Sequence, residues 1–250
     1  MTISKTTHMQ YKRVLLKLSG ELLKSNKSKK NIDHAQLQHY AEEIIKAHKL
    51  GIGITIVIGG GNIHRGNKDV LQLNRTESDH IGMLATIMNG IALRSYLENN
   101  GVPTMHMSSI ACAMCDVYKQ QEAIKALEHG HVVVLTGGLG LPYFTTDTAA
   151  SLRAIELGAE VMLKMTNVDG IYSADPNIDP YAVKFDHLTF QDAIDKKLAV
   201  LDRMAFVLCQ TYKLPLIVFD AAIPNALLRI IKGEHIGTIV SDHKEPNIYP

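Results

Sequence analysis

A β-branched segment that runs directly into three consecutive glycines restricts the fold of this chain more than any other feature. Residues Ile56–Ile58 have the composition of a buried strand, Gly59–Gly61 follow at once, and Arg65 comes four residues later. Glycines at a strand end remove every Cβ that would keep a ligand from the backbone N–H groups, and an arginine adds a bidentate contact to a phosphate. The alternative is a tight turn with positive φ, for which one glycine would suffice. The segment therefore predicts a phosphate-binding loop.

Short apolar segments alternate with helical patterns along the rest of the chain. Strands are expected at Tyr11–Leu18, Ile52–Ile58, Val102–Met107, His131–Thr136, Val161–Lys164, Leu216–Phe219 and Thr238–Val240. Helices are expected from Asp33 to about Leu50, from Asp79 as N-cap to near Asn100, from Asp147 or Thr148 to Leu157, and over Lys119–His129, Thr189–Lys196, Asp202–Thr211 and Asn225–Lys232. This alternation predicts an α/β fold, a three-layer α/β/α sandwich around a mainly parallel sheet, with ligands at the carboxyl ends of the strands.

Length and charge set the broad class. The chain has 250 residues and a formal net charge of +1, so it carries no basic surface typical of nucleic-acid binding. We expect residues 1–10 to be frayed and residues 11–250 to form a single domain. No apolar signal-peptide core and no run long enough to span a bilayer is present, which predicts a cytoplasmic protein without a membrane partner.

Three cysteines argue against a disulfide framework, because the count is odd. Cys112 and Cys115 have the C-x-x-C spacing of redox and zinc sites, but a zinc site needs further ligands, and His106 is the only candidate nearby. Buried apolar thiols are the interpretation that we favour over a metal or redox role.

Three further segments carry polar groups to the expected strand ends, and Asp79 stands at the expected start of a long helix. Lys17-Leu18-Ser19-Gly20 ends the first strand, and its lysine can present an ammonium to a transferred phosphate. Residues Gly137–Asp147 place glycines, hydroxyls and an acid between a strand and a helix, and Lys164–Pro176 leave a strand with a lysine and then supply an aromatic ring and carboxylates. Helix capping is the alternative for Asp79 and for the hydroxyls at residues 145 and 146. The chain has no G-x-x-x-x-G-K-[ST], no G-x-G-x-x-G after its first strand, no protein-kinase signature and no H-E-x-x-H.

Together these motifs resemble bacterial uridylate (UMP) kinases of the amino-acid-kinase superfamily. The resemblance rests on Lys17–Gly20, Gly59–Arg65, Asp79–Met83, Thr145–Asp147 and Val168–Pro176, in the family's order and spacing, and extends from about Tyr11 to Ile239. It implies transfer of the γ-phosphoryl group of MgATP to UMP in pyrimidine nucleotide biosynthesis, giving UDP and ADP. It also implies a homo-oligomer, namely a hexamer. Nucleic acid would not be required for catalysis. The Mg²⁺ would arrive with ATP, since no protein cage of carboxylates is visible in the sequence and no protein metal ligand is assigned.

The resemblance assigns roles residue by residue. Catalysis would use Lys17, with Asp147 and Asp202 as the acids that orient lysines. The ATP side would comprise Lys17, Leu18, Ser19, Gly20, Gly61, Arg65, Thr166, Tyr172 and Asp175. The UMP side would comprise Gly60, Asp79, Leu139, Gly140, Leu141, Pro142, Tyr143, Phe144, Thr145 and Thr146, with Asp79 accepting from the ribose hydroxyls. In-line transfer between two phosphorylated substrates needs cationic and N–H donors between them and little else.

Two departures from the family bear on specificity and regulation. The family usually has Thr-Gly-Asn-Pro where this chain has Leu139-Gly140-Leu141-Pro142, so base reading by this loop falls to main-chain groups. The loop over Leu22–Asn31 is lysine-rich and lacks the glycines and the aromatic residue that many members use in activation by GTP.

Two other functions remain open at this point. One is a superfamily enzyme acting on a carboxylate or carbamate, such as acetylglutamate, aspartate or carbamate itself. Arg65, Thr146 and the helix of Asp79 favour a nucleoside monophosphate instead, and the missing regulatory domain argues against aspartokinase. The other is a regulatory protein that senses pyrimidine nucleotides without catalysis, against which Lys17 and Asp147 argue.

Overall fold

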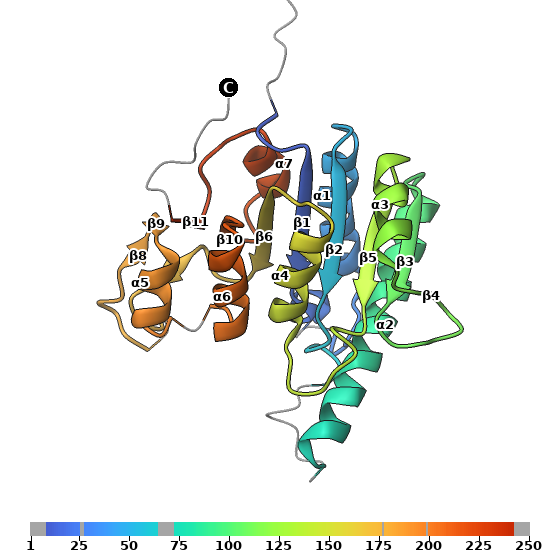
Figure 1. Ribbon diagram of the computed structural model, residues 1–250, viewed down its shortest axis with the longest axis horizontal. Coiled ribbons are helices and arrows are strands. Elements are labelled where there is room, and N and C mark those ends of the chain that lie inside the picture. Colours follow the sequence, from blue (N-terminus) through green and yellow to red (C-terminus); the bar gives the residue numbers. More distant parts are fainter. Residues whose placement is uncertain (1–8, 26–27, 65–72, 177, 199, 243–250) are drawn as a thin grey trace, which may run out of the picture.

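The computed structural model describes residues 9–25, 28–64, 73–176, 178–198 and 200–242. Arg65 and most of the N-terminal segment expected to be frayed lie outside these residues. Within them, a nine-stranded sheet has the order β4-β3-β5-β2-β1-β6-β10-β11-β9 (Figure 1). Its strands are β1 (Arg13–Leu18), β2 (Gly53–Ile58), β3 (Thr104–Ser108), β4 (Asp116–Val117), β5 (Val132–Thr136), β6 (Val161–Thr166), β9 (His187–Leu188), β10 (Leu216–Asp220) and β11 (Thr238–Val240).

All neighbouring strands of this sheet pair in parallel except β10 and β11, which are antiparallel. The chain leaves β1 toward β2 on one side and later returns to β6 on the other. The carboxyl ends of these three strands therefore surround a topological switch point, where open α/β sheets bind their ligands.

Helices cover both faces of the sheet, as the sequence predicted. One buried core unites α1 (His34–His48), α2 (Arg75–Asn99) and α7 (Ala226–Ile231) with one face, and a second unites α3 (Gln120–Glu128), α4 (Thr146–Glu156), α5 (Phe190–Asp195) and α6 (Arg203–Thr211) with the other. The α/β/α sandwich and the mainly parallel sheet are thus confirmed.

Strand alternation decides where the lysine of the first strand lies. Leu16 and Leu18 belong to the core beneath α1, whereas Leu15 belongs to the core beneath α4. Because successive side chains of a strand point to opposite faces, Lys17 projects with Leu15 toward α4. Lys164 is its register partner on the adjacent parallel strand β6 and projects to the same side.

Several local predictions were wrong. Helix α2 begins at Arg75 with Asn74 as its N-cap, so Asp79 lies in its second turn and does not cap it. Helix α4 begins at Thr146, one residue before the expected start, and Thr145 caps it by accepting from two helix N–H groups, which confirms the capping alternative for that residue. A short helix at Gly20–Leu23 was not predicted, and the expected loop after β6 contains a small antiparallel pair, β7 (Ile171–Tyr172) and β8 (Lys184–Phe185).

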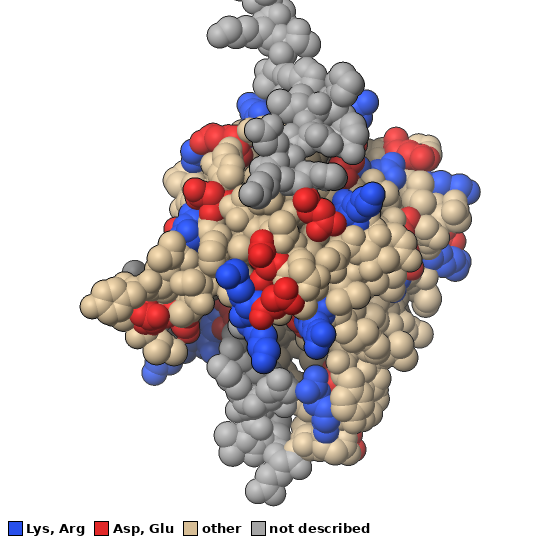
Figure 2. Space-filling view, turned by 60° about the vertical axis from the view of Figure 1, so that its left-hand side comes forward, with Lys and Arg blue, Asp and Glu red and all other residues tan. Residues whose placement is uncertain are grey.

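Basic and acidic side chains are interspersed on the face shown in Figure 2, in line with the small net charge. Among the described residues, none of the helices combines the length and the apolar character needed to cross a bilayer.

Candidate functional site

Two lysines and one aspartate form a buried cluster where β1, β6 and α4 meet. The Lys17 Nζ lies 2.8 Å from Asp147 Oδ1, and the Lys164 Nζ lies 2.7 Å from Asp147 Oδ2. Lys164 also donates to the carbonyl of Val200. The three side chains are only 9–14 % exposed. Two ammonium groups and one carboxylate leave one positive charge in excess, and this charge is worth most where water is excluded.

Burial and charge oppose each other in this cluster. Burial acts to raise the pKa of Asp147, but the ammonium groups of Lys17 and Lys164 outweigh it and hold that pKa below its ordinary value. Burial lowers the pKa of Lys164, and repulsion from Lys17 acts in the same direction against the attraction of Asp147. The aspartate is therefore ionised near neutral pH and holds both lysines at the strand ends.

Asp202, the other predicted acid, contacts Thr148, which follows Asp147 in α4. It caps α6 by accepting from the Ala205 N–H at 2.9 Å, and its carboxylate also accepts from the hydroxyls of Thr145 and Thr148, the latter at 2.8 Å. Its negative charge acts to raise the pKa of Lys164, against the stronger lowering by burial. Asp202 thus connects the N-termini of α4 and α6, and its predicted role in orienting lysines remains a prediction.

The glycine loop after β2 is packed tightly against two neighbours. A Cβ on Gly60 would lie 2.7 Å from the Gly82 carbonyl oxygen of α2, and one on Gly20 would lie 2.6 Å from the Gly59 carbonyl oxygen. None of Gly59–Gly61 has a positive φ, which excludes the turn alternative. Close backbone approach, which the sequence reasoning did not consider, is the reason for glycine at position 60.

A reciprocal amide pair fixes this loop to α2. The Asn62 Nδ2 donates to Asn89 Oδ1 at 2.9 Å, and the Asn89 Nδ2 donates to Asn62 Oδ1 at 2.7 Å. The remaining N–H groups go to the carbonyls of Asn31 and Gly59. Both side chains are buried and each finds its partners, so the loop is held by a saturated network.

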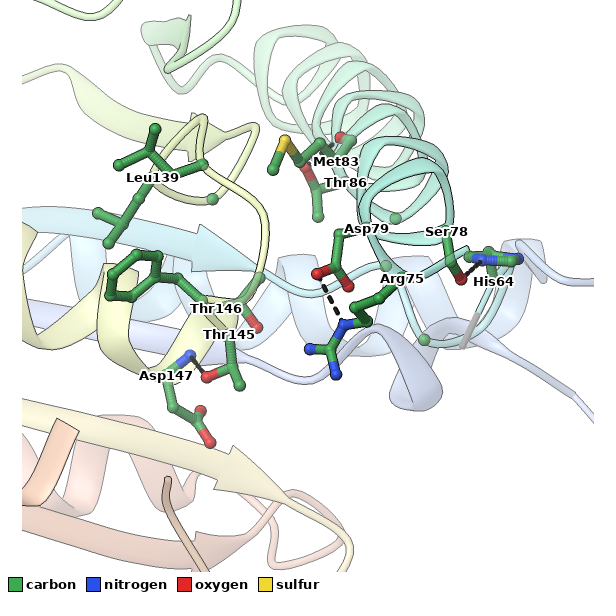
Figure 3. A pocket seen from close by; sticks show the side chains of 16 residues that line it. His64, Arg75, Ser78, Asp79, Met83, Thr86, Leu139, Thr145, Thr146 and Asp147 are labelled. Carbon is green, nitrogen blue, oxygen red and sulfur yellow. Dashed lines mark hydrogen bonds and ion pairs between the residues drawn. The ribbon is translucent and has the colours of Figure 1, made fainter. Parts of the chain in front are cut away.

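A cavity of about 640 Å³ opens between the glycine loop, α2 and the segment before α4, and it reaches Asp147. Figure 3 shows α2 side chains on one wall and the segment from Leu139 to Asp147 on the other. Seven of the residues predicted on the UMP side line it: Gly60, Asp79, Leu139, Leu141, Phe144, Thr145 and Thr146. Gly140, Pro142 and Tyr143 belong to the same segment without lining the cavity, and Gly61 from the predicted ATP side lines it.

The far rim of the cavity is closed by a second carboxylate. Asp79 Oδ2 lies 2.7 Å from Arg75 Nε (Figure 3) and also accepts from the Tyr143 N–H at 2.7 Å. The Arg75 guanidinium lies over the Tyr143 ring. Tyr143 adopts a φ of 71°, an uncommon value for a residue with a Cβ. We call Arg75, Asp79 and Tyr143 the acceptor rim.

The other described residues predicted on the ATP side do not line the cavity. Leu18 ends β1, Ser19 follows it, and Gly20 begins the short helix after it. Thr166 ends β6, and its carbonyl accepts from the Ala221 N–H at 2.8 Å. Tyr172 in β7 donates to Asp169 at 2.7 Å, and the backbone carbonyl of Asp175 accepts in the turn that follows.

Two site residues were missed by sequence reasoning. Lys164 was noted as a strand-end lysine but was not assigned a role, although its strand V-M-L-K-M-T repeats the pattern of R-V-L-L-K-L around Lys17. A lysine near the end of an otherwise apolar strand was the available signal. Arg75 was missed because α2 was expected to begin at Asp79.

The fold and the cluster define a class of protein. Residues 12–220 match the amino acid kinase family, and the chain belongs to that family. Within it, the chain is 48 % identical to the uridylate kinase of Legionella pneumophila (strain Paris), over 93 % of this chain and 94 % of that protein. It is 46 % identical to the uridylate kinase of Marinobacter nauticus, over 96 % of this chain and the whole of that protein. The crystal structure of UMP kinase from Bacillus anthracis superimposes with a TM-score of 0.89 at 37 % identity, covering 93 % of this chain and 96 % of that one.

Proposed function

We propose that this protein is a UMP kinase, which transfers the γ-phosphoryl group of ATP to UMP and releases UDP and ADP. The observation that carries the proposal is a nucleotide-sized cavity with a cationic cluster, Lys17–Asp147–Lys164, at its inner end and a carboxylate, Asp79, on its far rim. The similarity to uridylate kinases over more than nine-tenths of the chain supports it.

The geometry suggests how the reaction proceeds. A phosphate oxygen of UMP attacks the γ-phosphorus of ATP in line, a new O–P bond forms, and the bond to the β–γ bridging oxygen breaks with ADP as the leaving group. Charge spreads over the transferred group in the transition state. The ammonium of Lys17 is held by Asp147, which lines the cavity, and would stabilise that charge.

Recognition of the acceptor would come from the opposite end of the cavity. Asp79 would accept the ribose hydroxyls in charge-assisted hydrogen bonds, replacing its present contact with the Tyr143 N–H. Leu139 and Leu141 present no hydrogen-bonding side chain, so main-chain groups of this segment would read the base.

Mg²⁺ would accompany ATP. The described residues contain no group of three or more His, Cys, Asp or Glu side chains placed to hold a metal. Asp147, the carboxylate of the buried cluster, is already shared by two lysines. Such an arrangement fits a metal that binds through substrate phosphates, whose charge it would neutralise.

We further infer a cytoplasmic homo-hexamer. Leu84 and Met88 lie one turn apart on α2 and are each 53 % exposed, whereas the sequence placed this helix in the core. Covering such a pair by a second copy would bury it. Light scattering on the purified chain should give six times the mass of one chain, and Met88→Lys should lower that mass.

The decisive experiment measures ADP release with UMP, CMP, dUMP and acetylglutamate side by side. UMP should give the highest kcat/KM. A Lys17→Ala variant should lose turnover, while Lys24→Ala, at the exposed position that ends the short helix Gly20–Leu23, should retain it. Faster turnover with acetylglutamate than with UMP would refute the proposal, and binding of UMP without ADP release would favour a sensor.

A further inference from the structure

The C-x-x-C segment lies in a turn between β3 and β4. The Cys115 N–H donates to the Cys112 carbonyl at 3.4 Å, and the two residues form an antiparallel bridge. A turn of four residues holds its first and last Cα atoms within about 7 Å. Disulfides join Cα atoms about 4.4–6.8 Å apart, so the backbone already holds these two cysteines at a distance that a disulfide can span.

The side chains of Cys112 and Cys115 are partly accessible to solvent. Both cysteines are half-buried, which corrects the expectation of buried apolar thiols, while Cys209 is fully buried. Met114 between them is 59 % exposed, so a small reagent can reach the turn. The pKa of Cys115 is raised by burial and then by the adjoining Cys112, with which it is hydrogen-bonded.

The residues that lead from β3 into this turn contact the loop that lines the cavity. Ser109 Oγ donates to the Gly138 carbonyl at 2.7 Å, and a Cβ on Gly140 would lie 2.9 Å from the Ser109 carbonyl oxygen. Gly140 has a φ of 74°, a value that favours glycine. Residues 108–110, which lead into the cysteine turn, are therefore packed closely against the loop over residues 137–141.

We propose that Cys112 and Cys115 are a redox-modification site, which closes to an intramolecular disulfide and thereby restrains the loop at residues 137–141. The oxidant would be a low-molecular-weight disulfide. The Cys112 thiolate attacks one of its sulfurs, forming a mixed disulfide and releasing one thiolate. Cys115 then loses its proton to solvent and attacks the Cys112 sulfur, releasing the second thiolate. Two protein thiols are oxidised and one external disulfide is reduced to two thiols.

The test equilibrates the full-length protein with oxidised glutathione and measures intact mass, without reliance on enzyme activity. The native protein should lose about 2 Da, and Cys209→Ser, as a matched control, should lose the same. Cys112→Ser and Cys115→Ser should each retain one thiol of the pair beside buried Cys209, and gain about 305 Da as a mixed disulfide. More than one free thiol per chain in the oxidised, denatured native sample, or disulfide-linked dimers on a non-reducing gel, would overturn the site.

Hydrogen exchange tests the coupling to the acceptor loop. A cross-link compatible with the native turn removes open states of the segment, so amides at residues 137–141 should exchange roughly three- to tenfold more slowly after oxidation. The Cys112→Ser protein, treated identically, should show no slowing. Equal exchange in oxidised and reduced native protein would overturn the coupling even where the disulfide forms. Neither readout depends on the proposed phosphoryl transfer.

Discussion

Two aspartates at opposite ends of one cavity have different tasks. Asp147 is shared by two buried lysines, and the cluster keeps an excess positive charge away from water. Asp79 pairs with Arg75, whose side chain is 38 % exposed, so the acceptor rim is neutral and partly solvated. An unbalanced charge in a dry site suits a group that becomes more negative in the transition state. A balanced pair at the mouth suits binding, because its bonds can be exchanged for those of a ligand. The comparison predicts losses of turnover at one end and losses of affinity at the other.

Replacing Asp147 should have the largest effect. Asp147→Asn keeps the shape but leaves two buried ammonium groups without a counter-charge, which should destabilise the fold by about 3 kcal/mol and abolish turnover. Denaturant unfolding measures it, with Asp33→Asn as the control, because asparagine caps a helix about as well as aspartate. Equal stability of the variant would mean that the cluster is not held by charge.

The same substitution sets the sign of a pH effect. The pKa of Asp147 is lower in the folded protein than in the unfolded chain, where it is about 4. The ionised carboxylate therefore stabilises the fold above about pH 4, and this stabilisation is lost as the pH falls through the folded pKa. The difference in stability between the native protein and Asp147→Asn should therefore be constant near neutral pH and shrink only below about pH 4.

Lys17→Ala should reduce kcat by about 10²–10³ with little change in UMP affinity, because its ammonium acts mainly on charge that develops during transfer. Steady-state kinetics and calorimetric titration with UMP separate the two quantities. A folded Lys17→Ala protein with native turnover would place the catalytic charge elsewhere, with Lys164 as the next candidate.

Gly60→Ala tests the close contact between the glycine loop and α2. The added Cβ would meet the Gly82 carbonyl oxygen and Ala85, so we expect a loss of about 2 kcal/mol in unfolding free energy. Gly82→Ala is the matched control, since a Cβ there meets nothing within 4 Å and should stabilise the helix by up to about 1 kcal/mol. Equal thermal unfolding of both variants would contradict the close approach.

Asp79→Asn should weaken UMP binding about tenfold and leave ATP binding unchanged, because an amide makes weaker bonds to hydroxyls than a carboxylate does. Calorimetric titration with each nucleotide measures it. Glu77→Gln, two residues earlier on α2 at an exposed position, serves as the charge control. Unchanged UMP affinity would reduce the acceptor rim to a structural contact.

The smallest effect is expected at the two leucines. Leu139→Thr with Leu141→Asn should change the UMP-over-CMP ratio of kcat/KM only modestly, well below the roughly 10⁴–10⁵ expected where an essential buried polar partner is gained or lost. A native protein that accepts CMP as readily as UMP, with strong UMP selectivity in the double variant, would show that main-chain groups do not read the base.

Sequence reasoning located the parts that follow from periodicity and missed those that depend on packing. Seven of the nine strands of the main sheet, the layers and the position of Lys17 followed from apolar patterns, whereas the two-residue strands β4 and β9 did not. The start of α2 did not, because Asn74 and Asp79 are equally good capping residues and only the tertiary fold selects between them. The reason for glycine at position 60 was invisible, since Gly82 is far away in sequence. Arg65 lies outside the described residues, and its predicted contact with ATP remains a prediction.

The paired amides of Asn62 and Asn89 also constrain how this protein can change over generations. The two side chains hydrogen-bond each other reciprocally. Replacing one by an apolar residue therefore leaves buried donors and acceptors of its partner without hydrogen bonds, which costs about 1–3 kcal/mol of folding free energy. Replacing both by apolar groups of similar shape removes the unpaired amide, but the carbonyls of Asn31 and Gly59 then lose their side-chain donors. The two positions therefore form one heritable unit, because a change at either one leaves polar atoms of its partner unpaired. A lineage that carries this pair is expected to keep it or to exchange it whole.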